Sequence, residues 1–185
     1  MTTSNHLSPG MILQIENKLF KVQAAIKVTL PKGGPPYIKA TLTELSTQGK
    51  TKSVEKSFKL NQTLKEVNLE DRILEFLYLE GKDYLFLDIK SLDEVLISSQ
   101  IIGEASNYLK EGVEITASFH NGEPLTIHVP QFLEIMIAEI DEKPNQSGKV
   151  KAHLETGAVI FVPSYIQSGD IIKIDTYTNE YMQRV

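Results

Sequence analysis

Apolar and polar residues alternate in short runs along almost the whole chain, and turn residues separate these runs. In residues 19–29 one parity is apolar and the other is polar: Phe20, Val22, Ala24, Ile26 and Val28 against Lys21, Gln23, Lys27 and Thr29. A period of two is that of a β-strand with one face on a core and the other in solvent. The run therefore predicts a half-buried strand whose lysines lie on the outer face.

The next run predicts the second strand of a hairpin. Residues 37–45 alternate with Ile38, Ala40 and Leu42 on one face and Lys39, Thr41 and Thr43 on the other. Between the two strands lies LPKGGPPY, residues 30–37, which is rich in the turn formers glycine and proline. We expect a hairpin with a basic outer face and Lys32 near its tip.

Further strands are predicted along the rest of the chain. They cover residues 53–60, 73–89 with a Gly81-Lys82 turn, 114–129 with an Asn121-Gly122 turn, 132–140, 150–155, 158–162 and 170–176. An Asn-Gly step between alternating runs is a strong hairpin signal. Residues 98–112 alone look helical, ending at Gly112 as a helix cap would. Many short strands with turns between them are typical of β-barrels.

Charge is distributed unevenly between three parts of the chain. Residues 1–62 hold nine lysines and three glutamates, a net +6, whereas residues 63–128 carry −8 and residues 129–185 carry −3. With the strand pattern, these steps predict three small all-β domains with boundaries at residues 62 and 128. Neutralisation of phosphate supplies most sequence-independent affinity for nucleic acid, so the basic N-terminal domain is a candidate for it. A solvated lysine face is the alternative reading of the same charge.

Several classes of protein are disfavoured by the composition. The chain has no cysteine, so disulfides and thiolate metal sites are excluded. The N-terminus lacks the regions of a signal peptide, and no apolar run approaches the roughly 20 residues of a membrane helix. We expect a cytoplasmic protein that does not associate with membranes.

The residues offer little for catalysis. The four histidines, at positions 6, 120, 128 and 153, show no metal-ligand spacing, and the glycines at 33 and 34 do not form a phosphate loop. The acidic stretch at residues 69–76 could supply paired carboxylates for general acid–base work, although such a stretch is more often a solvated edge. We predict no catalytic residue, no metal and no cofactor, and an enzyme, such as a hydrolase, is the weaker hypothesis.

The C-terminal run HLETGAVIFVPSYIQSGDIIKIDTYTNEYMQRV, residues 153–185, closely resembles the end of bacterial elongation factor P in the spacing of its TG, VP, GD and final EY..RV. Residues 74–88 are similar to the second domain of that family, and residues 7–22 with 54–60 to the first. The resemblance covers essentially the whole chain. It implies an N-terminal barrel of the KOW or SH3-like type followed by two OB-folds, arranged as an L similar in outline to tRNA.

The resemblance also implies a function and partners. It points to a translation factor that binds the ribosome between the peptidyl and exit sites, beside the peptidyl-tRNA, and promotes peptide-bond formation at proline-rich stretches. The expected partners are the ribosome, the peptidyl-tRNA and a lysine-modifying enzyme, and we expect a monomer. The alternative is a divergent second copy of the factor, which binds ribosome or RNA in a regulatory role without polyproline rescue.

The tip of the first hairpin carries the functional residue that the resemblance implies. In this family a basic tip residue, usually a lysine and commonly modified, reaches toward the peptidyl transferase centre. Lys32 matches it, because it follows Val28 by four residues. The surrounding tip-loop residues are Pro31, Gly33, Gly34, Pro35 and Pro36. Glycines allow close approach of the backbone to RNA, and prolines lower the entropy lost when the loop is ordered.

The register of this tip has an alternative. The family loop typically has PGKG, two residues and an aromatic, whereas this chain has one more residue before Tyr37. Alignment from Tyr37 places Gly33 at the tip instead of Lys32.

Other candidate RNA-binding residues lie in the first and last domains. They are Lys21, Lys27, Lys39, Tyr181 and Arg184. The last two match the end pattern of the family and are candidates for contact with tRNA or small-subunit RNA. In the alternative, Tyr181 packs on its barrel and Arg184 pairs with a surface acid such as Glu180.

Overall fold

The computed structural model describes residues 1–46 and 51–185. Most of these residues lie in strands, which form three curved sheets in the described ranges, and the predicted all-β barrel fold is confirmed. Contacts divide the described chain into two compact units, residues 1–71 with 118–126 and residues 72–117 with 127–185. The domain boundaries at residues 62 and 128 stay a prediction.

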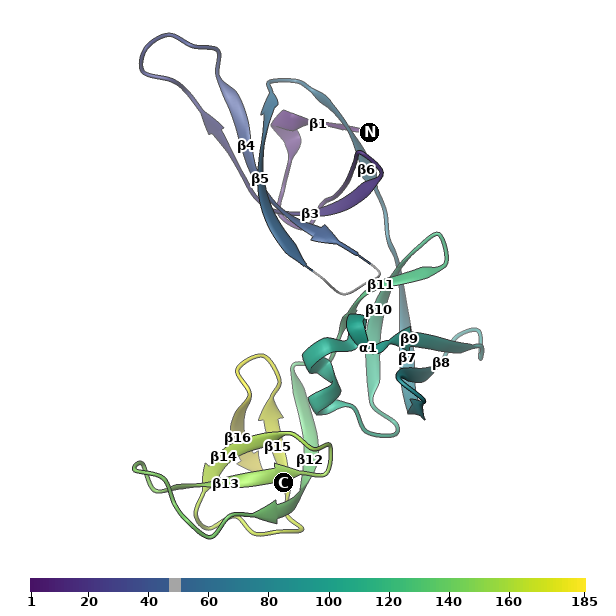
Figure 1. The fold of residues 1–185 in the computed structure, drawn as a ribbon, viewed down its shortest axis with the longest axis vertical. Helices are drawn as coiled ribbons and strands as arrows, with labels where there is room; N and C mark the ends of the chain where they lie inside the picture. Colours follow the sequence, from purple (N-terminus) through teal and green to yellow (C-terminus); the bar gives the residue numbers. More distant parts are fainter. Residues whose placement is uncertain (47–50) are drawn as a thin grey trace. The chain divides into compact units, whose positions relative to one another are not determined.

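The first unit is built on a sheet with the strand order β1-β6-β2-β3-β4-β5 (Figure 1). Its elements are β1 (Thr2–Thr3), the 3-10 helix η1 (Ser4–His6), β2 (Ile12–Ile15), β3 (Lys18–Val28), β4 (Tyr37–Leu45), β5 (Lys52–Lys59) and β6 (Thr63–Val67). The inward side chains of these strands make a core around Leu13, Phe20, Val22 and Leu42. The β3–β4 hairpin is present as predicted, because Val28 pairs with Tyr37 across its end.

A β-bulge interrupts β3. Val22 pairs with Leu42 of β4, but Ala24 pairs with Thr41, so Gln23 is an extra residue on β3. A bulge sets two residues of one strand against one residue of its partner and increases the local twist. It also exchanges the two faces of the strand for every residue that follows.

The bulge overturns part of the predicted alternation. Beyond Gln23, Ile26 pairs with Lys39 on the outer face and is 59% exposed. Lys27 instead pairs with the buried Ile38, so it extends from the inner side of the sheet. The prediction that Ile26 faces inward and Lys27 outward is therefore wrong.

The second sheet has the order β11-β10-β7-β8-β9. Its elements are β7 (Glu70–Glu80), β8 (Asp83–Asp88), β9 (Glu94–Ser98), the helix α1 (Ser99–Ile102), the 3-10 helix η2 (Gly103–Tyr108), β10 (Glu114–His120) and β11 (Glu123–His128). The predicted turn between β10 and β11 is confirmed, since Asn121 and Gly122 have φ angles of +51° and +83°, as a type I′ turn requires. Residues 118–126 of this hairpin belong to the first unit, where Leu125 packs against Ile12 and Leu19.

Asp88 ends β8 with a tight side-chain cap. Its Oδ1 accepts hydrogen bonds from the backbone N–H groups of Lys90 at 2.9 Å and Ser91 at 3.1 Å. The bond from Ser91 and then that from Lys90 lower the pKa of the Asp88 carboxyl, and they outweigh its burial, which acts in the opposite direction. Asp88 therefore stabilises the turn as an anion.

The helix predicted over residues 98–112 is much shorter. The α-helical part ends at Ile102, and Gly103 has φ +52°, which a right-handed helix cannot continue. The chain proceeds as a 3-10 helix to Tyr108, and Gly112 lies in a later turn with φ +87° instead of capping a helix. This broken path buries both Ile102 and Tyr108.

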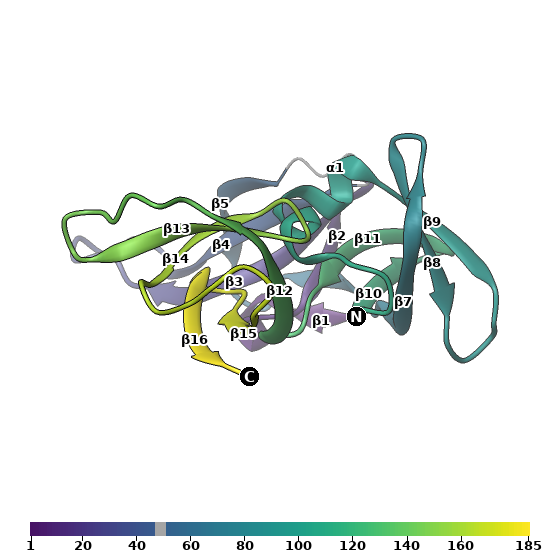
Figure 2. The same cartoon turned by 90° about the horizontal axis from the view of Figure 1, so that it is seen from below.

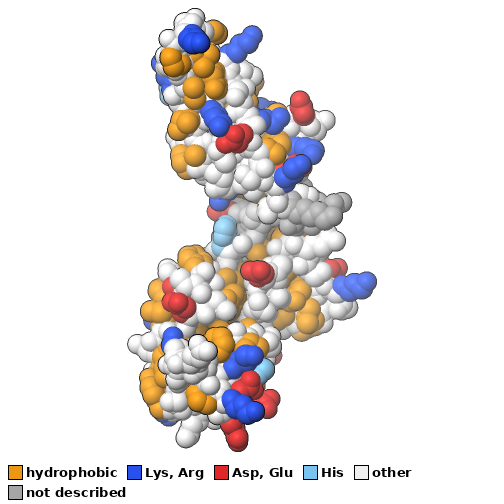
Figure 3. All heavy atoms as spheres, turned by 60° about the vertical axis from the view of Figure 1, so that its left-hand side comes forward, with side chains coloured by type: hydrophobic (Ala, Val, Ile, Leu, Met, Phe, Trp, Pro, Cys, Tyr) orange, Lys and Arg blue, Asp and Glu red, His pale blue; other side chains and the backbone are white. Residues whose placement is uncertain are grey.

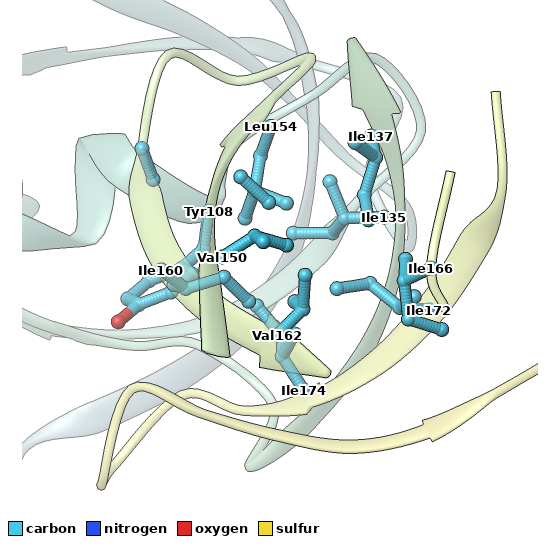
Figure 4. Packing of buried hydrophobic residues seen from close by; sticks show 12 residues of the cluster. Tyr108, Ile135, Ile137, Val150, Leu154, Ile160, Val162, Ile166, Ile172 and Ile174 are labelled. Carbon is cyan, nitrogen blue, oxygen red and sulfur yellow. The ribbon is translucent and has the colours of Figure 1, made fainter. Parts of the chain in front are cut away.

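The third sheet has the order β14-β13-β12-β15-β16, and its β13–β14 hairpin is visible in Figures 1 and 2. Its strands are β12 (Phe132–Ile140), β13 (Lys149–Leu154), β14 (Val159–Pro163), β15 (Ile171–Asp175) and β16 (Glu180–Arg184). Isoleucines and valines from all but the last strand fill a core around Ile135, Ile137, Ile172 and Ile174 (Figure 4). Tyr108 of η2 packs in the same core.

Candidate nucleic-acid interface

The candidate site begins with the tip loop, residues 29–36, which joins β3 to β4 and projects from the sheet of its own unit (Figure 1). Pro31, Lys32, Gly33 and Pro35 are exposed, whereas Gly34 and Pro36 are half-buried. Lys32 forms no ion pair with another residue of the described ranges. Its ammonium group is therefore free to meet an external anion.

A turn presents Lys32. The backbone N–H of Gly33 donates to the carbonyl of Leu30 at 3.4 Å, which makes Pro31 and Lys32 the two central residues of the turn. Pro31 suits the first central position because its ring fixes φ near −65°. Gly33 follows with φ +81°, a conformation that favours glycine. Local chemistry thus places Lys32 at the corner of this turn.

The three candidate lysines of the hairpin differ in environment. Lys21 lies opposite Thr43 on the outer face, and Lys39 on the same face forms an ion pair with Glu55 at 3.0 Å. An exposed pair of this kind contributes at most about 1 kcal/mol, so phosphate can replace Glu55. Lys27 lies apart from both.

Lys27 lines a shallow hollow of about 290 Å³ on the other side of the hairpin. The other lining residues are Ser4, Asn5, Leu7, Ala25, Ile26, Ile38 and Leu60. The predicted basic outer face therefore holds Lys21 and Lys39 but not Lys27. Lys50, which contributed to the charge count, lies outside the described residues.

Basic and apolar side chains are mixed on the first unit. In Figure 3, lysine side chains lie beside exposed hydrophobic ones on the visible face of this unit. The exposed hydrophobic residues include Ile26 and Leu30, at 59% and 43% of their full exposure. The face seen in Figure 3 thus offers separate cations with apolar side chains between them.

Tyr181 and Arg184 of β16 both have partners within their own barrel. Tyr181 packs against the third core, and its hydroxyl lies 3.2 Å from that of Tyr165. Burial first, and then the hydrogen bond with Tyr165, raise the pKa of Tyr181. Arg184 Nη2 lies 3.1 Å from Asp170 Oδ1, so its acidic partner is Asp170 and not the Glu180 named from the sequence.

Sequence reasoning missed Tyr165. This tyrosine is 63% exposed and shares a hydroxyl contact with Tyr181, yet it lies between strands in the stretch SYIQSG. The signal in the sequence that could have indicated an exposed tyrosine here is its position among the polar turn residues of this stretch. With Tyr181 and Arg184, Tyr165 extends the candidate surface of the last barrel.

In the described ranges, the two adjacent carboxylates of the acidic stretch do not form a pair. Side chains alternate along a strand, so Glu70 and Asp71 of β7 point to opposite faces. Asp71 also accepts a hydrogen bond from Ser118 at 2.6 Å. In the described ranges, no three histidine or acidic side chains come together as metal ligands would, and no helix is long and apolar enough to cross a membrane.

Comparison with known proteins gives matches over most of the chain. Residues 69–127 match the model of the elongation factor P OB domain, and residues 133–184 match that of the elongation factor P C-terminal domain. The chain is 54% identical to "Elongation factor P 1" of Protochlamydia amoebophila and 40% identical to that of Chlamydia trachomatis. It is 33% identical to "Elongation factor P" of Coprothermobacter proteolyticus. Each alignment covers 100% of both chains.

Proposed function

Because this chain belongs to the elongation factor P family, we propose that it acts on the ribosome as a non-enzymatic translation factor. It binds in the cytoplasm as a monomer, between the peptidyl and exit sites, and promotes peptide-bond formation at proline-rich stretches. The observation that carries the proposal is the exposed Lys32, which a proline- and glycine-defined turn presents at the end of the β3–β4 hairpin.

Positioning alone is enough for such a role. Holding two reactants in the reactive geometry removes much of the entropic part of a barrier, and no catalytic group is needed. Proline is a constrained residue whose ring fixes one backbone dihedral. Lys32 reaches toward the peptidyl transferase centre and holds the peptidyl-tRNA end in place by charge.

The remaining candidate residues support binding. Lys21 and Lys39 contact RNA phosphates from the outer face of the hairpin and Lys27 does so from its other side, and each contact releases counterions. Tyr181 and Arg184 contact tRNA or small-subunit RNA from the last barrel, once Arg184 exchanges Asp170 for phosphate. The exposed Lys32 amine is also open to a modifying enzyme, and the intact mass of the protein from its native host measures that modification.

The experiment replaces Lys32 with alanine and measures rescue of a Pro-Pro-Pro reporter. We expect rescue to be lost while the fold is kept, because an exposed turn residue contributes within about 0.5 kcal/mol to stability. Ribosome binding should weaken only modestly, because the other lysines remain. Lys82→Ala is the matched control, since Lys82 is also an exposed lysine in a hairpin turn.

The same assay decides the register of the tip. The double change Lys32→Gly and Gly33→Lys moves the lysine by one position, and it should retain rescue only if Tyr37 sets the register. A Lys32→Ala protein that rescued as well as the wild type, at equal ribosome occupancy, would refute the tip-lysine role.

A second function is favoured by the tip loop itself. LPKGGPPY departs from the family's PGKG pattern on both sides of the lysine. This departure favours a divergent copy that binds the ribosome in a regulatory role without polyproline rescue. Ribosome profiling of a deletion strain separates the two functions, because only the first predicts stalls confined to proline-rich codons.

A further inference from the structure

Leu30 and Gly34 close the base of the turn that presents Lys32. A Cβ atom placed on Gly34 would lie 2.6 Å from Leu30 Cδ1, 3.6 Å from its Cβ and 3.7 Å from its Cγ. The Leu30 side chain therefore lies directly against the Gly34 backbone. It occupies the space that the side chain of any other residue at position 34 would need.

The two neighbouring glycines thus serve different purposes. Gly33 has φ +81°, but its Cβ position has no neighbour within 4 Å, so conformation is what requires glycine there. Gly34 has no left-handed φ, and a Cβ atom there would meet the end of the Leu30 side chain, which would have to shift. Replacing Gly34 with alanine should therefore leave the backbone path intact but displace the Leu30 side chain.

Leu30 has no role in the core of its unit. It is 43% exposed, and it is not one of the residues that pack in the described hydrophobic core around Leu13 and Phe20. Its main-chain carbonyl accepts the hydrogen bond from Gly33, and its side chain covers Gly34. The hydrogen bond with Gly33 and the contact with Gly34 thus connect Leu30, on one side of Lys32, to the residues on its other side.

We propose that Leu30 is a positioning residue for Lys32, because its contact with Gly34 closes the tip loop and holds the lysine in one orientation before the ribosome binds. The inference rests on the proposed function and adds a residue to it. A lysine already held in the reactive geometry removes part of the entropic barrier at the reacting centre, whereas ribosome affinity depends mainly on the other lysines that meet phosphate. The contact should therefore act on the rate at the reacting centre more than on ribosome affinity.

The test measures Pro-Pro-Pro synthesis in reconstituted translation as a function of factor concentration. Leu30→Ala and Gly34→Ala should each lower the maximal rate by roughly tenfold, less than the 10²-fold that a 1 Å misplacement can cost. The half-saturating concentration should stay unchanged in both. Leu30→Met, which keeps a side chain long enough to cover Gly34, should retain the rate of the wild type.

The double variant gives the sharpest readout. Leu30→Ala and Gly34→Ala remove the same contact, so together they should cost no more than one alone. Leu96→Ala is the control, because Leu96 is a leucine of similar exposure, 50%, on the second sheet. In the free protein, the backbone amide NMR order parameters of Lys32 and Gly33 should fall in both single variants and remain unchanged in the control.

Three outcomes would overturn the inference. In the first, Leu30→Ala keeps the wild-type maximal rate while Lys32→Ala abolishes rescue. In the second, the two single effects multiply in the double variant, which would show independent causes. In the third, only the half-saturating concentration changes, which would make Leu30 a direct ribosome contact. Full rescue by Lys32→Ala is a different pattern: it refutes the proposed function, and the positioning role falls with it.

Discussion

Tyr108 joins the short helical segment after β9 to the core of the third sheet, and its replacement should strongly destabilise the second unit. Its side chain is 8% exposed, and its hydroxyl donates to Asn179 Oδ1 at 2.9 Å. Burial first, and then the carboxylates of Glu104 and Asp175, raise the pKa of Tyr108, so the hydroxyl remains a donor at neutral pH. The ring and the hydroxyl contribute separately, and two substitutions distinguish them.

The magnitude follows from the area of the ring. A buried aromatic side chain removes about 150–250 Å² from water. At roughly 25 cal/mol per Å², this is worth about 4–6 kcal/mol, an upper value because the unfolded chain already buries some of it. Tyr108→Ala should therefore cost about 3–5 kcal/mol. Tyr108→Phe should cost about 0.5–1.5 kcal/mol, near the lower end because the exposed Asn179 can bind water instead.

The assay is hydrogen exchange of the full-length protein, read at peptides from β12 and β13. A probe for each region is needed, because a chain with two compact units need not unfold in one transition. The control is the same pair of substitutions at Tyr177, which is 70% exposed and should cost within about 0.5 kcal/mol. If Tyr108→Ala cost no more than Tyr177→Ala, the ring would not be part of this core.

Three further predictions follow from particular residues. The folded pKa of Asp88 is lowered, so its stabilising contribution is present above about pH 4 and is lost as the pH falls further, through the folded pKa. Asp88→Asn keeps the acceptor oxygen but should remove this part of the acid sensitivity in thermal unfolding from pH 2 to 7. The bulge predicts that Ile26→Thr costs within about 0.5 kcal/mol in urea unfolding and Val22→Thr about 1–3 kcal/mol, whereas equal costs would restore strict alternation. If Lys27 contacts one phosphate, Lys27→Gln should reduce the slope of log ribosome affinity against log salt by about 0.7–0.9, and an unchanged slope would exclude that contact.

Local chemistry was enough to predict the all-β class and several of the turns. Successive side chains of a strand point to opposite faces, so a strand between core and solvent has alternating apolar and polar residues. This pattern is visible in neighbouring residues of the sequence. The Asn121-Gly122 turn depends on two positive φ angles, and glycine and asparagine adopt these at low cost. The tip turn likewise needs only Pro31 and Gly33, so the presentation of Lys32 was accessible from eight residues of sequence.

Strands of weak alternation could not be found in this way. The runs at β1, β2, β6, β9 and β16 were not predicted as separate strands. Each has two to five residues and takes its place through hydrogen bonds to a longer neighbour, as β16 does by pairing with β15. Pairing with a distant segment is a property of the folded chain and leaves little trace in five residues.

Tertiary structure alone decided the register of β3, the acidic partner of Arg184 and the contact of Leu30. The register of β3 changes at Gln23 because β4 supplies one residue fewer there, and no feature within β3 marks that position. Arg184 binds Asp170 rather than the nearby Glu180 because β16 lies beside β15, which begins just after Asp170. Leu30 covers Gly34 because the turn folds the chain back on itself. The period of apolar residues in the sequence indicates which side chains share a face of a strand. The register between strands and the partners of each side chain depend on residues that only folding brings together.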